Sequence, residues 1–139
     1  MSKKLSTLSY RWFEEVWNQG MENSIDELLD RTATIHGIEG ITEPGPQGFK
    51  IFYHTFRQGF TNIHVEVEEV ISADDYESAR CQVTATSKTT GQTVHFPGQT
   101  TIRTKDGKIV ESWNNFDFLS MNQQLGYELT LAKATTPGL

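Results

Sequence analysis

One carboxylate of the chain, Asp117, stands between two phenylalanines in the segment Phe116-Asp117-Phe118. An ionised carboxylate is rarely buried alone, because its desolvation favours the protonated form. A carboxyl group in apolar surroundings can therefore remove a proton from carbon next to a carbonyl group and later return it. The alternative is that Asp117 reaches solvent and caps a C-terminal helical turn that begins at Phe118. The residues alone leave both roles open.

The histidines of the chain do not form a recognisable metal site. His54, His64 and His95 occur at unrelated spacings on different predicted elements, without the close pairs that zinc sites require. His36 precedes Gly37 at the end of a short predicted strand, where it lines a pocket, takes part in catalysis beside Asp117, or has a structural role. His36 or Asn114 is also a candidate to hold an enolate oxygen by a hydrogen bond.

Several polar and aromatic residues are candidates for contacts with a ligand. Arg103 either binds a ligand oxygen or pairs with Glu111 across a hairpin, and the ion pair is favoured. Gln99 belongs to a polar set on neighbouring strands that either lines a wet cavity or faces a partner subunit. Helical periodicity favours the core for the aromatic residues of the third helix, but Tyr53 and Trp12 are expected to turn an edge towards a cavity. The candidate ligand-binding residues are Trp12, Tyr53, Gln99, Arg103, Trp113 and Asn114.

The spacing of apolar residues predicts three helices in the first half of the chain. Apolar residues recur every three to five positions over 8–17 and again over 25–29, which is typical of helices. A short strand is expected at 32–36, before a loop rich in glycine and proline. An aromatic stripe with helical spacing then covers 49–60.

The second half of the chain shows the period of two that indicates strands. Four strands are expected within 63–71, 79–85, 94–103 and 109–114, and the last two are joined by a hairpin at Lys105-Asp106-Gly107-Lys108. This order predicts an α+β fold in which a curved antiparallel sheet wraps around the N-terminal helices as an open cone. The mouth of such a cone, lined by aromatic residues, is where a small ligand is expected.

Length and composition limit the possible functions. With 139 residues, the chain is expected to form a single domain over 1–139. The net charge of −6 and the scattered Lys and Arg residues argue against a surface for nucleic acid. No stretch approaches the roughly 18 apolar residues of a membrane span, and the lone Cys81 cannot form an internal disulfide. We expect a cytoplasmic protein that binds neither nucleic acid nor membrane.

Taken in order, a series of short segments resembles the SnoaL-like polyketide cyclases, which belong to the nuclear-transport-factor-2-like superfamily of α+β cones. The resemblance extends from about Leu8 to Gly126, and the ordered set is more specific than any one segment. The matching segments are 11–20, 25–30, 34–37, 45–49, 65–70, 106–113 and 124–126.

The resemblance implies an intramolecular aldol closure of a polyketide ester, without metal or cofactor. In those cyclases an aspartate near the end of the last strand is the general acid and base, and the Trp-x-x-x-Asp pattern assigns that role to Asp117. The resemblance also makes His36 a pocket residue and gives Arg103 a position at which those enzymes have histidine. Most relatives have Trp-Asp where this chain has Trp113-Asn114, so an acid common in the family is absent. The loop at 87–91 is also shorter than usual.

Two functions from different classes follow. The first is a cofactor-independent cyclase or isomerase in which Asp117 transfers a proton on a carbonyl-rich, mostly apolar substrate. The second is a non-catalytic binding or assembly module, because one fold hosts many functions. A hydrolase, with water held by Asp117 and Asn114, is a third possibility. We also expect a homodimer through a flat outer sheet face that includes Gln82, Thr84, Gln99 and Thr101.

Overall fold

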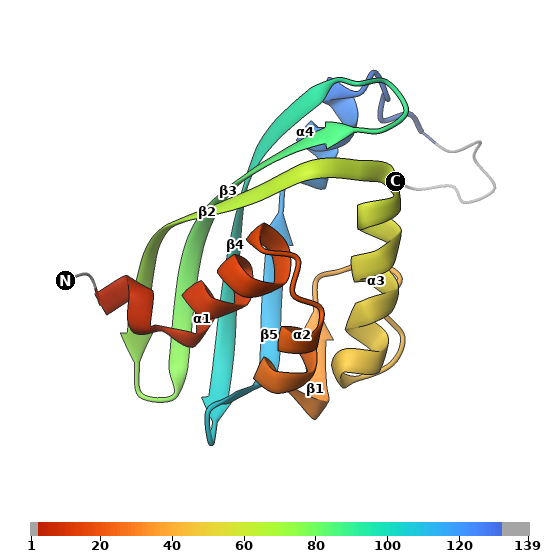
Figure 1. Cartoon of the computed structure of the whole chain (residues 1–139). Coiled ribbons are helices and arrows are strands. Elements are labelled where there is room, and N and C mark those ends of the chain that lie inside the picture. Colours follow the sequence, from red (N-terminus) through yellow and green to blue (C-terminus); the bar gives the residue numbers. More distant parts are fainter. Residues whose placement is uncertain (1–2, 132–139) are drawn as a thin grey trace.

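A curved five-stranded sheet bends over a layer of helices (Figure 1). The computed structural model describes residues 3–131 of the chain. The strands lie in the order β1-β5-β4-β3-β2, and the sheet does not close on itself. The predicted α+β cone is therefore confirmed.

The helices lie against the concave face and the side of this sheet (Figure 1). Helix α1 continues directly into the π-helical η2, and together they form the helix that the apolar spacing predicts at 8–17. Gly20 follows with φ +67°, a left-handed conformation that glycine adopts without steric cost. The helical elements are η1 (Lys3–Ser6), α1 (Leu8–Arg11), η2 (Trp12–Asn18), α2 (Asn23–Leu28), α3 (Gly45–Gly59) and α4 (Phe118–Gln124).

The strands show the predicted alternation of side chains, but one strand pair runs parallel where an antiparallel sheet was predicted. Strands β2, β3, β4 and β5 pair as antiparallel neighbours, as predicted. The edge strand β1 instead runs parallel to β5, with His36 opposite Trp113. The strands are β1 (Leu29–His36), β2 (Phe60–Ala73), β3 (Tyr76–Ser87), β4 (Thr93–Lys105) and β5 (Lys108–Phe116).

The end of β5 explains a proline inside the central strand β4. Gly98 pairs with Phe116, the last residue of β5, so Pro97 has no strand partner on that side. The carbonyl oxygen of Pro97 accepts a hydrogen bond of 3.0 Å from the backbone N–H of Asp117. A proline, which lacks the N–H, is tolerated there because no ladder bond is lost.

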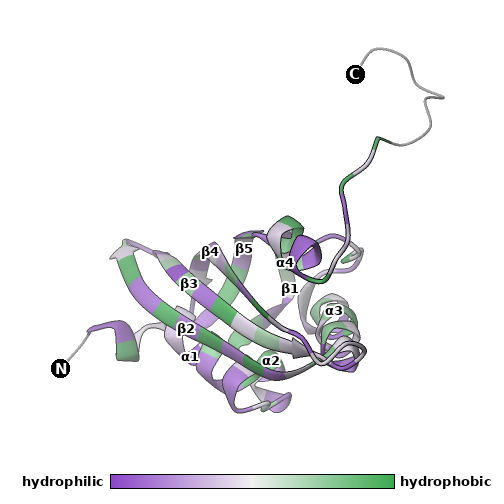
Figure 2. Ribbon diagram, turned by 90° about the horizontal axis from the view of Figure 1, so that it is seen from above, coloured by the Kyte–Doolittle hydropathy of each residue, from purple (hydrophilic) through white to green (hydrophobic). Residues whose placement is uncertain are grey.

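The hydrophobic core lies between the helices and the concave face of the sheet. Along the strands, apolar and polar residues alternate between the two faces (Figure 2). Phe96 and Val94 of β4 belong to the same core cluster as Val16, Ile25 and other buried helical residues. Burial of these side chains is the main term that stabilises such a fold.

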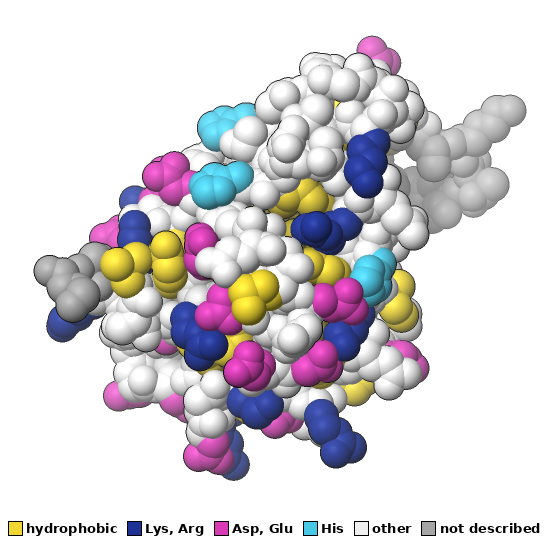
Figure 3. Space-filling view, viewed as in Figure 1, with side chains coloured by type: hydrophobic (Ala, Val, Ile, Leu, Met, Phe, Trp, Pro, Cys, Tyr) yellow, Lys and Arg dark blue, Asp and Glu magenta, His cyan; other side chains and the backbone are white. Residues whose placement is uncertain are grey.

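Charged side chains of both signs are interspersed over the face seen in Figure 3, without a continuous basic patch. Within residues 3–131, none of the helices has the length and hydrophobicity needed to cross a bilayer.

Candidate functional site

An open cavity of about 60 Å³ lies between the helices and the concave face of the sheet. This volume is smaller than the cavities of about 150 Å³ that are known to hold benzene. A ligand of the size of benzene or larger therefore requires wall side chains to move. Four of the wall phenylalanines, Phe52, Phe56, Phe116 and Phe118, are only partly buried and are therefore candidates for such a movement. This aromatic cavity is lined by Trp12, Phe13, Trp17, Ile38, Phe49, Phe52, Phe56, Ile63, Val65, Val83, Phe96, Asn114, Phe116 and Phe118.

Asn114 is the one amide side chain that the described residues, 3–131, place in the wall of the aromatic cavity. Alternation along β5 turns Asn114 inward together with Ser112 and Phe116, while Trp113 and Asn115 face outward. Its Oδ1 accepts a hydrogen bond of 2.7 Å from the Thr100 hydroxyl. Its Nδ2 donates to the carbonyl oxygen of His36 at 2.9 Å and to Ser112 Oγ at 3.1 Å. These bonds fix the amide and join β1, β4 and β5 at the cavity wall.

A smaller inner chamber of about 30 Å³ adjoins the aromatic cavity and shares Trp12, Phe13, Phe49 and Asn114 with it. Its wall is more polar, because three hydroxyl side chains face it. They are Ser9 of α1, Thr100 of β4 and Ser112 of β5, all buried. These residues were not among the sequence candidates. For Thr100 and Ser112, the alternation along β4 and β5 could have indicated that the side chains point inward.

Asp117 lies at the surface and caps helix α4. Its Oδ1 accepts a hydrogen bond of 3.0 Å from the backbone N–H of Ser120. Phe116 and Phe118 line the aromatic cavity, whereas Asp117 contributes to a shallow depression on the outer face of the sheet. The sequence left two roles open for Asp117, and in the structure it has the capping role. A carboxylate enclosed by its two phenylalanines is not what the structure shows.

His36, Arg103 and Trp113 gather outside the cavity around the carboxylate of Glu111. His36 Nε2 lies 2.8 Å from Glu111 Oε2, and Arg103 donates to Glu111 Oε1 at 3.1 Å. The hydrogen bonds with these two partners hold the pKa of Glu111 below its usual value, and the bond with His36 has the larger effect. The His36 ring stacks on Trp113 with centroids 5.4 Å apart. The favoured ion pair of Arg103 is confirmed, and the side chain of His36 is 44% exposed.

The remaining candidates are divided between the cavity, the core and the outer face. Trp12 lines both the aromatic cavity and the inner chamber. Tyr53 is a core residue, 2% exposed, whose hydroxyl donates to the carbonyl oxygen of Val16 at 3.1 Å. Gln99 lies in the outer depression beside Asp117. The structure thus brings only Trp12 and Asn114, among the predicted site residues, to the cavity.

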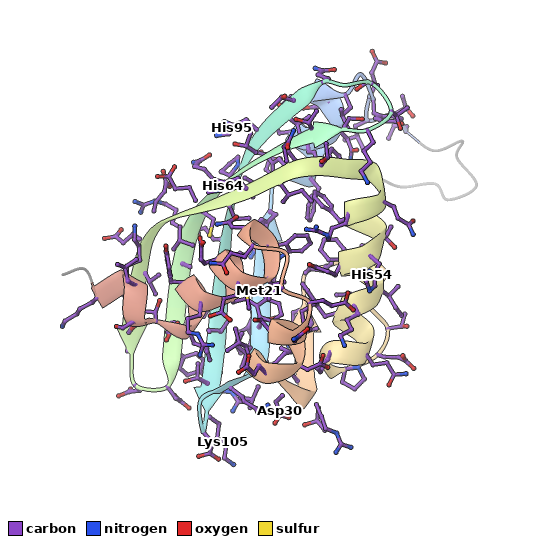
Figure 4. The ribbon with its side chains drawn as sticks, in the orientation of Figure 1. Met21, Asp30, His54, His64, His95 and Lys105 are labelled. Carbon is purple, nitrogen blue, oxygen red and sulfur yellow. The ribbon has the colours of Figure 1, made fainter. Side chains whose placement is uncertain are left out.

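The histidines do not converge. Figure 4 shows His54 on α3, away from His64 on β2 and His95 on β4. Within residues 3–131, no group of three or more His, Cys, Asp or Glu side chains has the geometry to hold a metal ion.

Comparison with protein-family models gives a match to the SnoaL-like polyketide cyclases over residues 7–125. The chain belongs to this family. The match covers both the helices and the sheet, so the resemblance seen in the ordered segments extends to the fold as a whole. No curated protein shows significant sequence similarity to the chain.

Solved structures of other proteins have the same cone-shaped fold. A Bacillus cereus protein described as a "putative polyketide cyclase" is 29% identical, with a TM-score of 0.78 over 88% of this chain and 80% of that one. IdmH from Streptomyces antibioticus, with the same description, is 23% identical, with a TM-score of 0.76 over 91% of this chain and all of its own. A Catenulispora acidiphila protein with a ketosteroid isomerase-like fold is 18% identical, with a TM-score of 0.76 over 87% of this chain and 93% of that one. The last two similarities show the fold alone.

Proposed function

We propose that this family member binds a small, mostly apolar molecule with a carbonyl group in the aromatic cavity. The observation that supports this best is the wall itself, which consists of aromatic and aliphatic side chains and one fixed amide, Asn114. Small-molecule sites typically combine an apolar lining with a few well-placed polar groups. The match to a family of polyketide cyclases over residues 7–125 also supports a small organic ligand.

The cavity wall favours binding over acid–base catalysis. Among residues 3–131, no Asp, Glu, His, Lys or Cys lines the aromatic cavity or the inner chamber. An aldol closure requires a group that accepts a proton from carbon. Asn114, for which the resemblance to the cyclases implies an acid, has an amide that cannot do this.

A cyclase or isomerase is the second candidate, because the family model is that of the cyclases. In this version Asp117 transfers the proton. From its position at the start of α4, Asp117 reaches a ligand in the cavity only if α4 moves or the ligand extends to the outer depression. The candidate therefore requires a conformational step that the binding function does not need.

The binding proposal is tested by NMR titration of ¹⁵N-labelled protein with acetophenone and with α-methylstyrene, two small aromatic probes. We expect the largest shifts at the backbone amides of Phe96, Asn114 and Phe116. Val83→Phe, which fills the cavity from the sheet side, should abolish these shifts, whereas Gln99→Ala on the outer face should retain them. Circular dichroism shows whether Val83→Phe is folded. In the wild type, shifts confined to the outer depression would contradict the proposal.

We further propose that the outer face of the sheet forms a homodimer. Tyr76, Trp113 and His36 form an aromatic group on this face, with 6.2 Å between the Tyr76 and Trp113 ring centroids. Tyr76 is 42% exposed. Partly exposed aromatic residues are enriched at protein–protein interfaces, where they are typical anchors.

A further inference from the structure

Ser9 presents a buried hydroxyl group that has no hydrogen-bond partner within residues 3–131. The residue is 1% exposed, and it lines the inner chamber. A buried hydroxyl without a partner is unfavourable, and native proteins satisfy nearly all such groups. The Ser9 hydroxyl therefore indicates a partner that the described chain does not supply.

The backbone around Ser9 is held firmly in place from the sheet. Glu77 of β3 accepts a hydrogen bond from the backbone N–H of Ser9 at 2.8 Å through Oε1, and one from Leu8 at 3.2 Å through Oε2. Thr7 caps the same turn by accepting from the Tyr10 N–H at 3.1 Å. The short helix α1 is thus fixed at its start, and the Ser9 hydroxyl can rotate without moving its backbone.

Ser112 supplies a second donor in the same chamber, one that has no acceptor among residues 3–131. Its Oγ accepts from Asn114 Nδ2 at 3.1 Å, so its own proton is available to another acceptor. Thr100, in contrast, has acceptors for its proton in Asn114 Oδ1 and the carbonyl oxygen of Trp113. The Asn114 amide uses both of its protons, so among the hydroxyl and amide side chains that residues 3–131 place in the chamber, Ser9 and Ser112 are the donors left for a guest.

We propose that the inner chamber binds the oxygen atom of a neutral carbonyl or hydroxyl group of the ligand, with Ser9 and Ser112 as hydrogen-bond donors. This inference rests on the proposed binding function and assigns the polar end of the ligand. A chamber of about 30 Å³ exceeds the roughly 10–15 Å³ that a cavity needs to hold one water molecule, so an oxygen atom of a ligand fits there. A carboxylate is excluded because no cationic side chain among residues 3–131 lines the chamber to compensate its desolvation.

The test uses two probes of nearly the same shape, acetophenone and α-methylstyrene. In α-methylstyrene a CH₂ group replaces the carbonyl oxygen of acetophenone. Dissociation constants are measured by NMR titration for the wild type, Ser9→Ala and Ser112→Ala. Loss of one hydrogen bond is expected to weaken acetophenone about three- to ten-fold relative to α-methylstyrene in each variant. The affinity for α-methylstyrene should stay within about two-fold, because that probe makes no such bond.

Ser24→Ala is the matched control. Ser24 is another fully buried serine, but its hydroxyl donates to Glu15 Oε1 at 2.7 Å and it lines neither chamber. The ratio of the two dissociation constants should therefore equal that of the wild type. The melting temperature of Ser9→Ala is expected to be unchanged or higher, because this change removes no hydrogen bond within residues 3–131.

The outcomes separate the two proposals. If neither probe binds the wild type, the proposed function itself is overturned. If α-methylstyrene binds but Ser9→Ala leaves the ratio unchanged, the cavity binds ligands while the assignment of the inner chamber is wrong. Benzoate has the same ring with a charge and should bind at least about ten-fold more weakly than acetophenone. Equal affinity for benzoate would contradict the choice of a neutral group.

Discussion

Asp117 is where a structural role and a catalytic role can be separated by single substitutions. As the cap of α4, it should be replaceable by asparagine, which caps helices equally well, but not by alanine. We expect Asp117→Ala to lower the free energy of unfolding by about 1 kcal/mol and Asp117→Asn to change it by only a few tenths. Urea denaturation followed by circular dichroism measures both.

Both Asp117 variants should bind acetophenone as the wild type does, because Asp117 does not line the aromatic cavity. A stable Asp117→Asn protein that had lost ligand binding, or turnover of a substrate once one is found, would instead support the cyclase. The same pair of variants thus distinguishes the two candidate functions.

The site residues show which roles a sequence can indicate. The segment Phe116-Asp117-Phe118 predicted either an enclosed acid or a cap, and no pattern decided between them. The direction of each side chain depends on where β5 ends and α4 begins. Asn114 was recognised because it departs from the family pattern. Ser9 was not, because a serine in a helix has no distinctive spacing, and only its lack of a partner in three dimensions makes it notable.

At the scale of elements, the packing of β4 against the end of β5 requires glycine at position 98. A Cβ atom there would clash with the ring of Phe116, which lines the aromatic cavity. We expect Gly98→Ala to destabilise the protein by about 1–3 kcal/mol through overpacking, and to weaken acetophenone binding by pushing Phe116 into the cavity. Thermal denaturation and NMR titration measure the two effects.

Gly59→Ala is the matched control for this change. A Cβ atom at Gly59, near the end of α3, meets no atom within 4 Å. The substitution should leave stability unchanged or raise it by up to about 1 kcal/mol, because it restricts the unfolded chain. Equal behaviour of the two alanine variants would show that Phe116 moves aside without cost.

The elements themselves were largely predictable. Periods of 3.6 and 2 gave the helices, the strands and the Lys105–Lys108 hairpin, because burial of one face requires these patterns. The parallel pairing of β1 with β5 was not predictable in this way. Strand direction depends on the path of the chain through α3, and local alternation carries no information about that path.

At the scale of the whole molecule, the ordered segments predicted the cone and the family. They did not predict that the cone would be nearly filled by its own aromatic side chains. The volume left inside depends on how the rings of Trp12, Trp17, Phe49 and Phe52 pack together. Side-chain packing of this kind is cooperative and is not encoded in any single spacing.

The proposed homodimer is the prediction that concerns the molecule as a whole. Light scattering after size exclusion should give twice the chain mass of 15.8 kDa at micromolar concentration. Trp113→Ala removes the central ring of the outer aromatic group and should shift the protein towards the monomer. Because Trp113 does not line the aromatic cavity, acetophenone binding should persist in this variant.

Gln58→Ala is the control for this change. Gln58 is exposed on α3, so the variant should remain a dimer. A monomeric wild type would contradict the interface, and loss of ligand binding in Trp113→Ala would show that the outer face and the cavity are coupled.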